Sequence, residues 1–140
     1  MIRGKPATVL AFDFGLRTIG VATGQVITRT ASELSTLRAR DGVPDWNAMD
    51  ALIHEWQPDV LVVGLPLNMD SSMSDMAKRA TRFAKRLRAR YDIAVELVDE
   101  RLTSFEARGE SNDLDTQHGI AARLIAESFL RGLGVPDQRL

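Results

Sequence analysis

The chain has 140 residues, of which 44% are hydrophobic and 26% charged, with a formal net charge of −1; it fits one domain over residues 1–140 and is too short for two. It contains no cysteine, which excludes disulfides, thiolate metal sites and cysteine nucleophiles, so any metal must be bound by oxygen or imidazole. The first apolar run, Ala7–Phe12, is too short for a signal segment or a membrane span, and we expect a cytoplasmic protein without a membrane partner.

The N-terminal third predicts three antiparallel strands. Ala7–Phe14 is apolar and rich in β-forming residues, and Arg17–Thr23 follows after a short turn at Gly15, which is typical of a hairpin. A third strand is expected near Thr28–Leu37. These segments lie next to each other in the chain, and we expect them to form one side of a sheet.

The middle of the chain predicts a helix followed by a buried strand. Asp45 is a good N-cap for a helix over Trp46–Trp56, whose apolar residues fall on one stripe, and Pro58 ends it. Asp59–Leu65 is a continuous apolar run of strand length. Such runs are typical of strands covered on both faces, as in parallel sheets.

The rest of the chain predicts further alternation of helices and strands. Ser72 and Asp75 form a plausible capping pair for a helix over Met73–Tyr91. The later elements are a strand at Ala94–Val98, a short helix with a capping box at Thr103 and Glu106, and a last helix over about Thr116–Arg131. This order predicts an α/β fold, a mixed sheet with helices packed on its faces.

Carboxylates follow two of the predicted strands. Asp13 lies at the end of the first strand, and Asp99 and Glu100 lie at the end of the Ala94–Val98 strand. Carboxylates that meet from separate strand ends can share divalent metal, which in two-metal nucleases stabilises the attacking and leaving oxygens. The alternatives are that Asp13 caps a hairpin turn and that Asp99 pairs with Arg101 in an exposed turn.

The Met73–Tyr91 helix is strongly basic on one side. Its basic residues include Lys78, Arg82, Lys85 and Arg86, and Asp75 is its only acid. A basic stripe opposite an apolar one favours binding of a phosphate backbone, although such a stripe is also often a solvated face. Arg17 and Arg101 lie beside the candidate acids and could contact a scissile phosphate, or else pair with those acids. Asn68 is expected to hold a turn.

Four segments of the chain resemble the YqgF/RuvX family in order and spacing. They are Leu10–Gln25, Val62–Asp70, Val98–Ala107 and Ile120–Leu130, and together they span nearly the whole sequence. The resemblance implies an RNase H-like fold related to Holliday-junction resolvases of the RuvC kind. It also implies a metal-dependent nuclease, a hydrolase acting on ester bonds, that processes the 5′ end of pre-16S rRNA in ribosome biogenesis.

The same resemblance assigns the catalytic residues. Asp13 and Glu100 take the places of the family's first two acids. The third acid lies nine residues ahead of a glutamate that is Glu127 here, and that position is His118. The metal ligands implied are therefore Asp13, Glu100 and His118, with Asp115, one helical turn earlier, as the alternative third ligand. The expected cofactor is Mg²⁺ or Mn²⁺, and an imidazole ligand suits Mn²⁺ better.

The sequence leaves the substrate and the assembly open. Pre-rRNA, in a possible ribosomal context, is the favoured partner, and a four-way DNA junction is the alternative. A junction resolvase needs two active sites, so a homodimer would favour the DNA substrate and a monomer would disfavour it. The missing third acid also keeps open a non-catalytic RNA-binding or regulatory protein.

Overall fold

The computed structural model describes residues 8–100 and 114–132. Its six-stranded sheet has the order β4-β3-β2-β1-β5-β6. The strands are β1 (Thr8–Asp13), β2 (Thr18–Gln25), β3 (Thr30–Arg40), β4 (Val43–Pro44), β5 (Val60–Leu65) and β6 (Ala94–Asp99). The helices are α1 (Trp46–Trp56), α2 (Asp75–Tyr91) and α4 (Leu114–Arg131). The short helix predicted at Thr103 and Glu106 lies outside the described residues.

The predicted mixed sheet is confirmed. β1 pairs antiparallel with β2, which pairs antiparallel with β3. β5 pairs parallel with both β1 and β6. The carboxyl ends of β1, β5 and β6 therefore lie along one edge of the sheet, where ligands bind in many α/β proteins.

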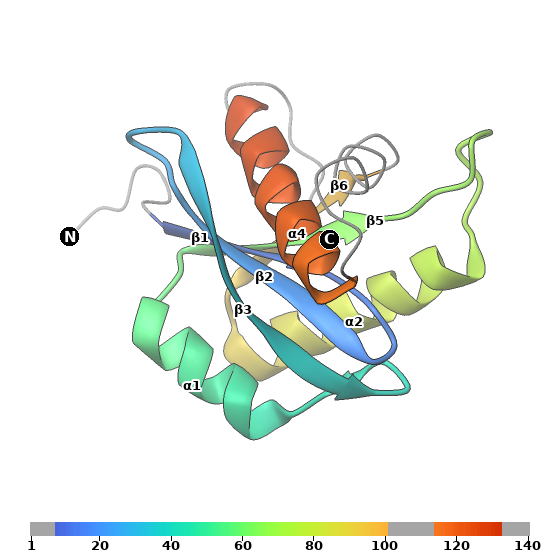
Figure 1. The fold of residues 1–140 in the computed structure, drawn as a ribbon, viewed down its shortest axis with the longest axis horizontal. Coiled ribbons are helices and arrows are strands. Elements are labelled where there is room, and N and C mark those ends of the chain that lie inside the picture. The colour runs from blue at the N-terminus through green and yellow to red at the C-terminus, as the bar shows by residue number, and fades with distance from the viewer. Residues whose placement is uncertain (1–7, 101–113, 133–140) are drawn as a thin grey trace.

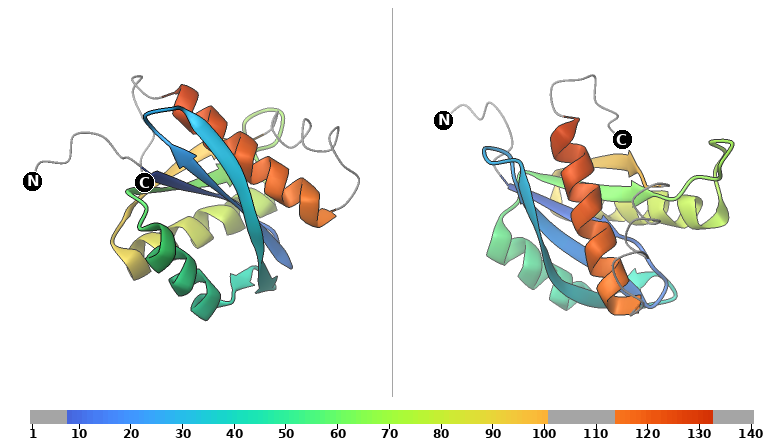
Figure 2. Two further views of the ribbon diagram at one scale, coloured as in Figure 1. Left: turned by 60° about the vertical axis from the view of Figure 1, so that its left-hand side comes forward. Right: turned by 45° about the horizontal axis from the view of Figure 1, so that its top comes forward.

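The helices cover both faces of the sheet (Figures 1 and 2). On one face Leu10 and Phe12 of β1 pack against α1 and α2, while on the other Val9 and Ala11 pack against α4. This alternation follows from the two-residue period of a strand. Continued to the end of β1, it directs Asp13 toward the α4 face and Phe14, which belongs to the α1 and α2 core, toward the other.

Two features differ from the prediction. The third strand continues to Arg40 and turns back into β4, which was not predicted. The turn consists of Asp41 and Gly42, both with positive φ (50° and 82°), so that Arg40 pairs with Val43. An Asp-Gly pair is well suited to such a two-residue hairpin because both residues tolerate positive φ.

The start of α2 is also different. The predicted helix began at Met73 with Ser72 as a cap, but the helix begins at Asp75 and its N-cap is Ser74, whose hydroxyl accepts from the Ala77 N–H at 2.9 Å. Ser72 instead belongs to the preceding loop, where its N–H donates to Asp70 and its hydroxyl accepts from the Asn68 amide at 3.0 Å. These local bonds compete with helix formation, and they confirm that Asn68 holds a turn.

The predicted start of α1 is confirmed. Asp45 accepts from the N–H groups of Asn47 and Ala48 at 3.0 and 3.3 Å, and the helix ends before a left-handed Gln57. Two hydrogen bonds join this helix to α2, because Arg90 donates to both carboxylate oxygens of Asp50, at 2.9 and 2.8 Å.

Among the described helices, none is long and apolar enough to cross a membrane.

Candidate active site

Asp13 and Glu100 meet because the strands that carry them flank β5. Asp13 is the last residue of β1, and Glu100 directly follows β6. The N–H of Glu100 donates to the carbonyl of Leu65 at 3.2 Å, which ties this residue to the end of β5. Both side chains are buried, with 8% of Asp13 and 3% of Glu100 exposed. The parallel register therefore brings two acids that are 87 residues apart in the chain into one buried site.

Gly64 of β5 leaves the space that this approach requires. It directly follows Val63, the β5 partner of Phe12, and it pairs with Val98 of β6, so it lies between the two acids. A Cβ at Gly64 would lie 2.7 Å from Oε2 of Glu100 and would overlap the side chain of Ile125. A glycine inside an apolar strand often marks such a close approach.

His118 reaches the same place from the first turns of α4. Its Nδ1 lies 2.6 Å from Oδ2 of Asp13, and the side chain is 29% exposed. Gly20, the β2 partner of Asp13, permits this contact because a Cβ there would overlap the backbone carbonyl of His118. A Cβ at Gly15 would lie 3.1 Å from Cε1 of the same imidazole. Two small residues thus let the helix place its imidazole against Asp13.

The surroundings of Glu100 strongly favour its protonated form. Burial of Glu100, together with the charge of Asp13, a hydrogen bond with Asp13 and the charge of Asp99, raises the pKa of Glu100 to about 10. At neutral pH and without a cation, Glu100 is therefore protonated and donates to the Asp13 carboxylate. A cation bound between two carboxyl groups held this close would stabilise their ionised forms.

The side chains of Asp13, Glu100 and His118 are of types that bind divalent cations, but their arrangement limits how many of them can bind one ion. Two carboxylates and one imidazole are ligands that Mn²⁺ accepts and that Mg²⁺ accepts in part. If His118 donates Nδ1–H to Asp13, only its Nε2 remains to bind a metal, as in carboxylate–histidine pairs of metal sites. Across residues 8–100 and 114–132, no three potential ligand side chains are arranged to hold one metal ion. Water and substrate oxygens would have to complete the coordination sphere.

The other residues predicted beside the acids are only partly described. Arg17 is exposed in the loop between β1 and β2, and its carbonyl accepts from the Ala39 N–H at 2.9 Å. Arg101 lies outside the described residues. Asp115 lies within the first turn of α4, but its side chain is outside the described part. Asp99 is exposed.

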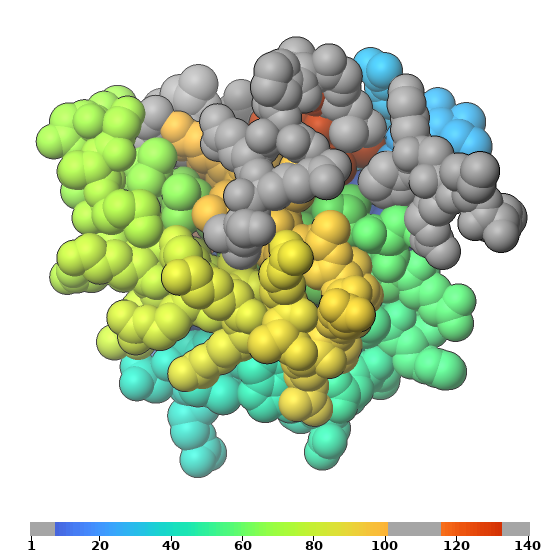
Figure 3. Space-filling view, turned by 180° about the vertical axis from the view of Figure 1, so that it is seen from behind, coloured from blue at the N-terminus to red at the C-terminus, as the bar shows by residue number. Residues whose placement is uncertain are grey.

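The predicted basic and apolar stripes of α2 are both present. Its buried residues are Ala77, Ala80, Phe83, Ala84 and Leu87. The residues predicted to bind nucleic acid, Lys78, Arg82, Lys85 and Arg86, are all exposed. In the space-filling view of the far side, α2 forms a large part of the surface and adjoins β3 and β4 (Figure 3). This basic face and the site around Asp13 lie on opposite faces of the sheet.

Two residues at the site and one at the basic face were not identified from the sequence. Gly64 and Gly20 make the contacts of Glu100 and His118 possible, and Asp41 places a carboxylate against Arg79 of the basic face at 3.4 Å. A glycine in the apolar run of β5 and the Asp-Gly pair were available as signals. They indicate a close approach and a turn, but neither signal identifies the residue that makes the contact.

Comparisons with known proteins agree with this architecture. A Pseudomonas fluorescens (strain SBW25) protein named "Putative pre-16S rRNA nuclease" is 53% identical over 131 residues, which cover 87% of this chain and 90% of that protein. A protein of the same name from Marinobacter nauticus is 52% identical over 132 residues, covering 88% and 92%.

Two solved structures share the fold. RuvC of T. thermophilus in complex with a Holliday junction has a TM-score of 0.56 at 12% identity, covering 95% of this chain and 99% of that one. The fowlpox virus resolvase with junction DNA has a TM-score of 0.53 at 13% identity, covering 91% and 99%. The predicted RNase H-like, RuvC-related fold is confirmed. The family model described as "RuvX: Holliday junction resolvase" matches residues 7–132, and the chain therefore belongs to the RuvX family of phosphodiester hydrolases.

Proposed function

We propose that this chain is a metal-dependent nuclease that processes the 5′ end of pre-16S rRNA, in the cytoplasm and in a ribosomal context. The observation that supports it most directly is the convergence of Asp13, Glu100 and His118 at the carboxyl ends of β1 and β6. Relatives at about half identity are named for the same substrate. Burying two acids together lowers the stability of a fold, and such arrangements are found mainly at functional sites.

The proposed roles of the residues follow from their contacts. Asp13 and Glu100 would hold Mg²⁺ or Mn²⁺, which when bound stabilises charge on the attacking and leaving oxygens of the phosphodiester. Asp13 would also orient His118 through the 2.6 Å contact with Nδ1, which leaves Nε2 directed away from Asp13. His118, or else Asp115 from the preceding turn, would complete the set of ligands.

The proposed grip on RNA is electrostatic. Lys78, Arg82, Lys85 and Arg86 present positive charge along exposed α2, and Arg17 does so beside the end of β1; Arg101 is proposed for the same role from its place in the sequence. Phosphate contacts orient a strand but carry little sequence information. Specificity would then come from the shape of the precursor RNA or from the ribosomal particle.

A junction-resolving activity is the second candidate. It is favoured by the description of the family model and by the junction-bound structures of similar fold. It needs two active sites at a fixed separation and therefore a homodimer, whereas the RNA reaction can be carried out by a monomer. The names of the most similar relatives favour RNA.

One cleavage assay tests these functions. The purified chain is incubated with a pre-16S fragment that carries its 5′ extension, or with a four-way DNA junction, in Mg²⁺ or Mn²⁺. We expect cleavage of the RNA at the 5′ side, dependent on the metal and absent from the Asp13→Asn variant; that control detects a contaminating nuclease, whose activity would persist. Preferential cleavage of the junction by a dimer would support the second candidate. RNA binding without cleavage in either metal would instead identify a non-catalytic RNA-binding protein.

A further inference from the structure

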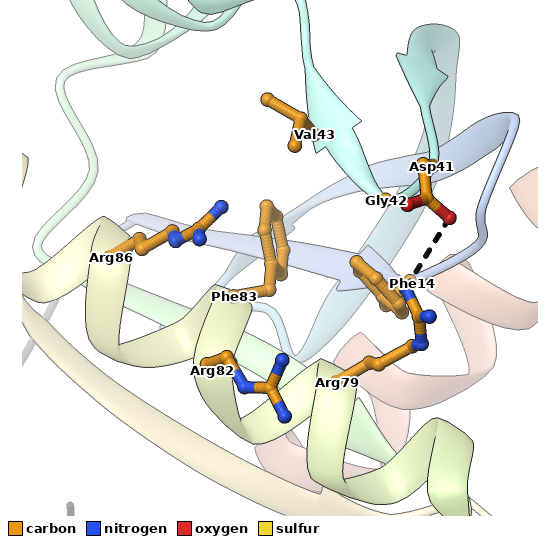
Figure 4. A pocket seen from close by; sticks show the side chains of 8 residues that line it. All are labelled: Phe14, Asp41, Gly42, Val43, Arg79, Arg82, Phe83 and Arg86. Atoms are coloured by element: carbon orange, nitrogen blue, oxygen red, sulfur yellow. Dashed lines mark hydrogen bonds and ion pairs between the residues drawn. The ribbon is translucent and has the colours of Figure 1, made fainter.

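A pocket of about 260 Å³ opens between α2 and the β3–β4 turn (Figure 4). Its apolar floor contains Phe14 and Phe83, two buried rings whose centroids lie 5.3 Å apart. The walls are formed by Arg79, Arg82 and Arg86 of α2 and by Asp41, Gly42 and Val43 of the turn. The three arginines are spaced by three and four positions and so share one side of the helix.

The side chains of this pocket carry an excess of positive charge. The lining contains three guanidinium groups and one carboxylate, and three minus one leaves two positive charges unbalanced among these residues. Asp41 and Arg79 form a weak, solvent-exposed ion pair at 3.4 Å. Within the described residues, neither Arg82 nor Arg86 forms an ion pair. Like charges at this spacing repel each other, so an anion in the pocket would relieve the repulsion.

The backbone holds Asp41 at the mouth of the pocket. The N–H of Gly42 donates to the carbonyl of Leu16 at 2.9 Å, which fastens the turn to the loop after β1. A Cβ at Gly42 would lie 2.8 Å from Cζ of Phe14, so the turn packs directly on the aromatic floor. The backbone of the turn is therefore held next to the arginines, and the Asp41 side chain is exposed at the mouth of the pocket.

The pocket lies next to the candidate active site along the chain and at the same end of β1. Phe14 in its floor directly follows Asp13, and the two side chains belong to opposite faces of the sheet. A nucleic-acid strand that passes over the end of β1 would meet the acids on one side and the arginines on the other. Guanidinium groups are well suited to phosphate because their N–H donors form forked hydrogen bonds.

We propose that this pocket binds one phosphate group of the RNA strand, on the opposite face of the sheet from the phosphate that is cleaved. Asp41 holds Arg79 when RNA is absent, and the phosphate displaces it when RNA binds. Arg82 and Arg86 contact the same phosphate. The identity of the ligand as RNA rests on the proposed function, but the phosphate chemistry of the pocket can be tested separately.

The test measures binding of a single-stranded RNA spanning the cleavage site, in a chelator so that the strand stays intact. A set of otherwise identical RNAs each carries one uncharged methylphosphonate in place of a phosphate. We expect one position in the strand to weaken binding to the natural chain by about tenfold, which is the size expected for a charge-assisted hydrogen bond. In the Arg82→Gln/Arg86→Gln variant, substitution at that position has no further effect, and the log–log salt slope falls by about 0.7.

Two further variants sharpen the test. Asp41→Asn keeps a residue that tolerates positive φ but removes the competing charge, so it should bind RNA up to about fivefold more tightly. Arg88→Gln removes the same charge from the exposed side of α2 outside the pocket, and the sensitive phosphate should remain at the same position. Thermal melting of each variant checks that it folds.

Two results would overturn the proposal. If the double variant keeps the same methylphosphonate sensitivity as the natural chain, the pocket does not contact that phosphate. If Asp41→Asn binds RNA equally or less tightly, Asp41 is no competitor. Failure of the proposed function is distinguishable, since it would appear as absence of cleavage in metal while the binding results in chelator stand.

Discussion

The two faces of the sheet present opposite chemistry at the carboxyl end of β1. On the α4 face, Asp13 and Glu100 are almost fully buried and share a hydrogen bond, and Asp13 contacts His118. On the α2 face, arginines line an open pocket above two aromatic rings. The alternation of one strand produces this separation, because it sends Asp13 one way and Phe14 the other.

The difference in burial indicates a difference in role. Burying a carboxylate costs free energy of folding unless the group is paired. The buried acids are therefore expected to lower the stability of the fold and to serve catalysis. Exposed guanidinium groups cost little and act over a distance, so the basic side is expected to contribute binding. Substitutions on the acidic side should therefore change the rate of cleavage, and those on the basic side should change affinity.

The largest effect is expected from Asp13→Asn. We expect cleavage to fall by more than the roughly 10- to 100-fold typical of groups that only orient a metal ligand. Thermal stability should be equal or higher, because a neutral amide costs less to bury than the Asp13 carboxylate. Asp99→Asn is the matched control, since Asp99 is exposed and precedes Glu100 directly. Full cleavage by Asp13→Asn, with Asp99→Asn as active, would contradict the assignment of the acidic side.

The next largest effect separates His118 from Asp115. If the His118 imidazole is a ligand, His118→Ala should lose most activity, and His118→Asp should shift the preferred metal from Mn²⁺ toward Mg²⁺. Asp115→Asn should then be tolerated. Cleavage rates of the three variants in each metal decide between the residues. Near-normal rates for His118→Ala, with a damaged Asp115→Asn, would assign the third ligand to Asp115.

Gly64→Ala should affect both stability and rate. Its new Cβ would lie 2.7 Å from Oε2 of Glu100 and would overlap Ile125, so a destabilisation of about 1–3 kcal/mol and a loss of activity are expected. Gly119→Ala, next to His118 in α4, is the control: its Cβ meets nothing closer than 3.6 Å, and the helix gains up to about 1 kcal/mol from alanine. Chemical denaturation and cleavage rates measure both. Equal behaviour of the two variants would show that the space at Gly64 is not needed.

Glu100→Gln should change how stability depends on pH in the metal-free protein. Because the pKa of Glu100 is raised from 4.5 to about 10, its contribution to stability is present below about pH 4.5 and is lost as pH rises toward 10. Glutamine resembles the protonated acid and does not ionise. The difference in melting temperature between Glu100→Gln and the natural chain should therefore grow in favour of the variant from pH 5 to pH 9. A difference that does not change with pH would mean that Glu100 is not buried beside Asp13.

The smallest effect is expected on the basic side. Replacing Lys78 and Lys85 of α2 by glutamine should weaken RNA binding a few-fold and lower the log–log salt slope by about 1.4, or about 0.7 for each phosphate contact. The rate at saturating RNA should stay unchanged. A fall in that rate would show that the basic side takes part in chemistry, and an unchanged salt slope would show that the lysines form only a solvated face.

Much of the fold could be predicted because local patterns dictate it. The apolar runs of β1 and β5, the amphipathic α2 and the N-cap at Asp45 were all recognisable from periodicity and capping chemistry. The predicted start of α2 was wrong, because Ser72 and Ser74 are both residues that favour a helix N-cap. Their partners decided between them: Ser74 binds the helix N–H, while Ser72 binds the loop.

The sequence by itself determined the alternation of elements, the placement of acids at two strand ends and the basic side of α2, since these depend on residues near one another in the chain. Only the tertiary structure decided which groups meet. The contact of Asp13 with His118, the space at Gly64 and the pairing of Asp41 with Arg79 join residues from separate elements. The physical reason is that register, helix docking and turn geometry are set by packing across the whole core, which no local pattern encodes.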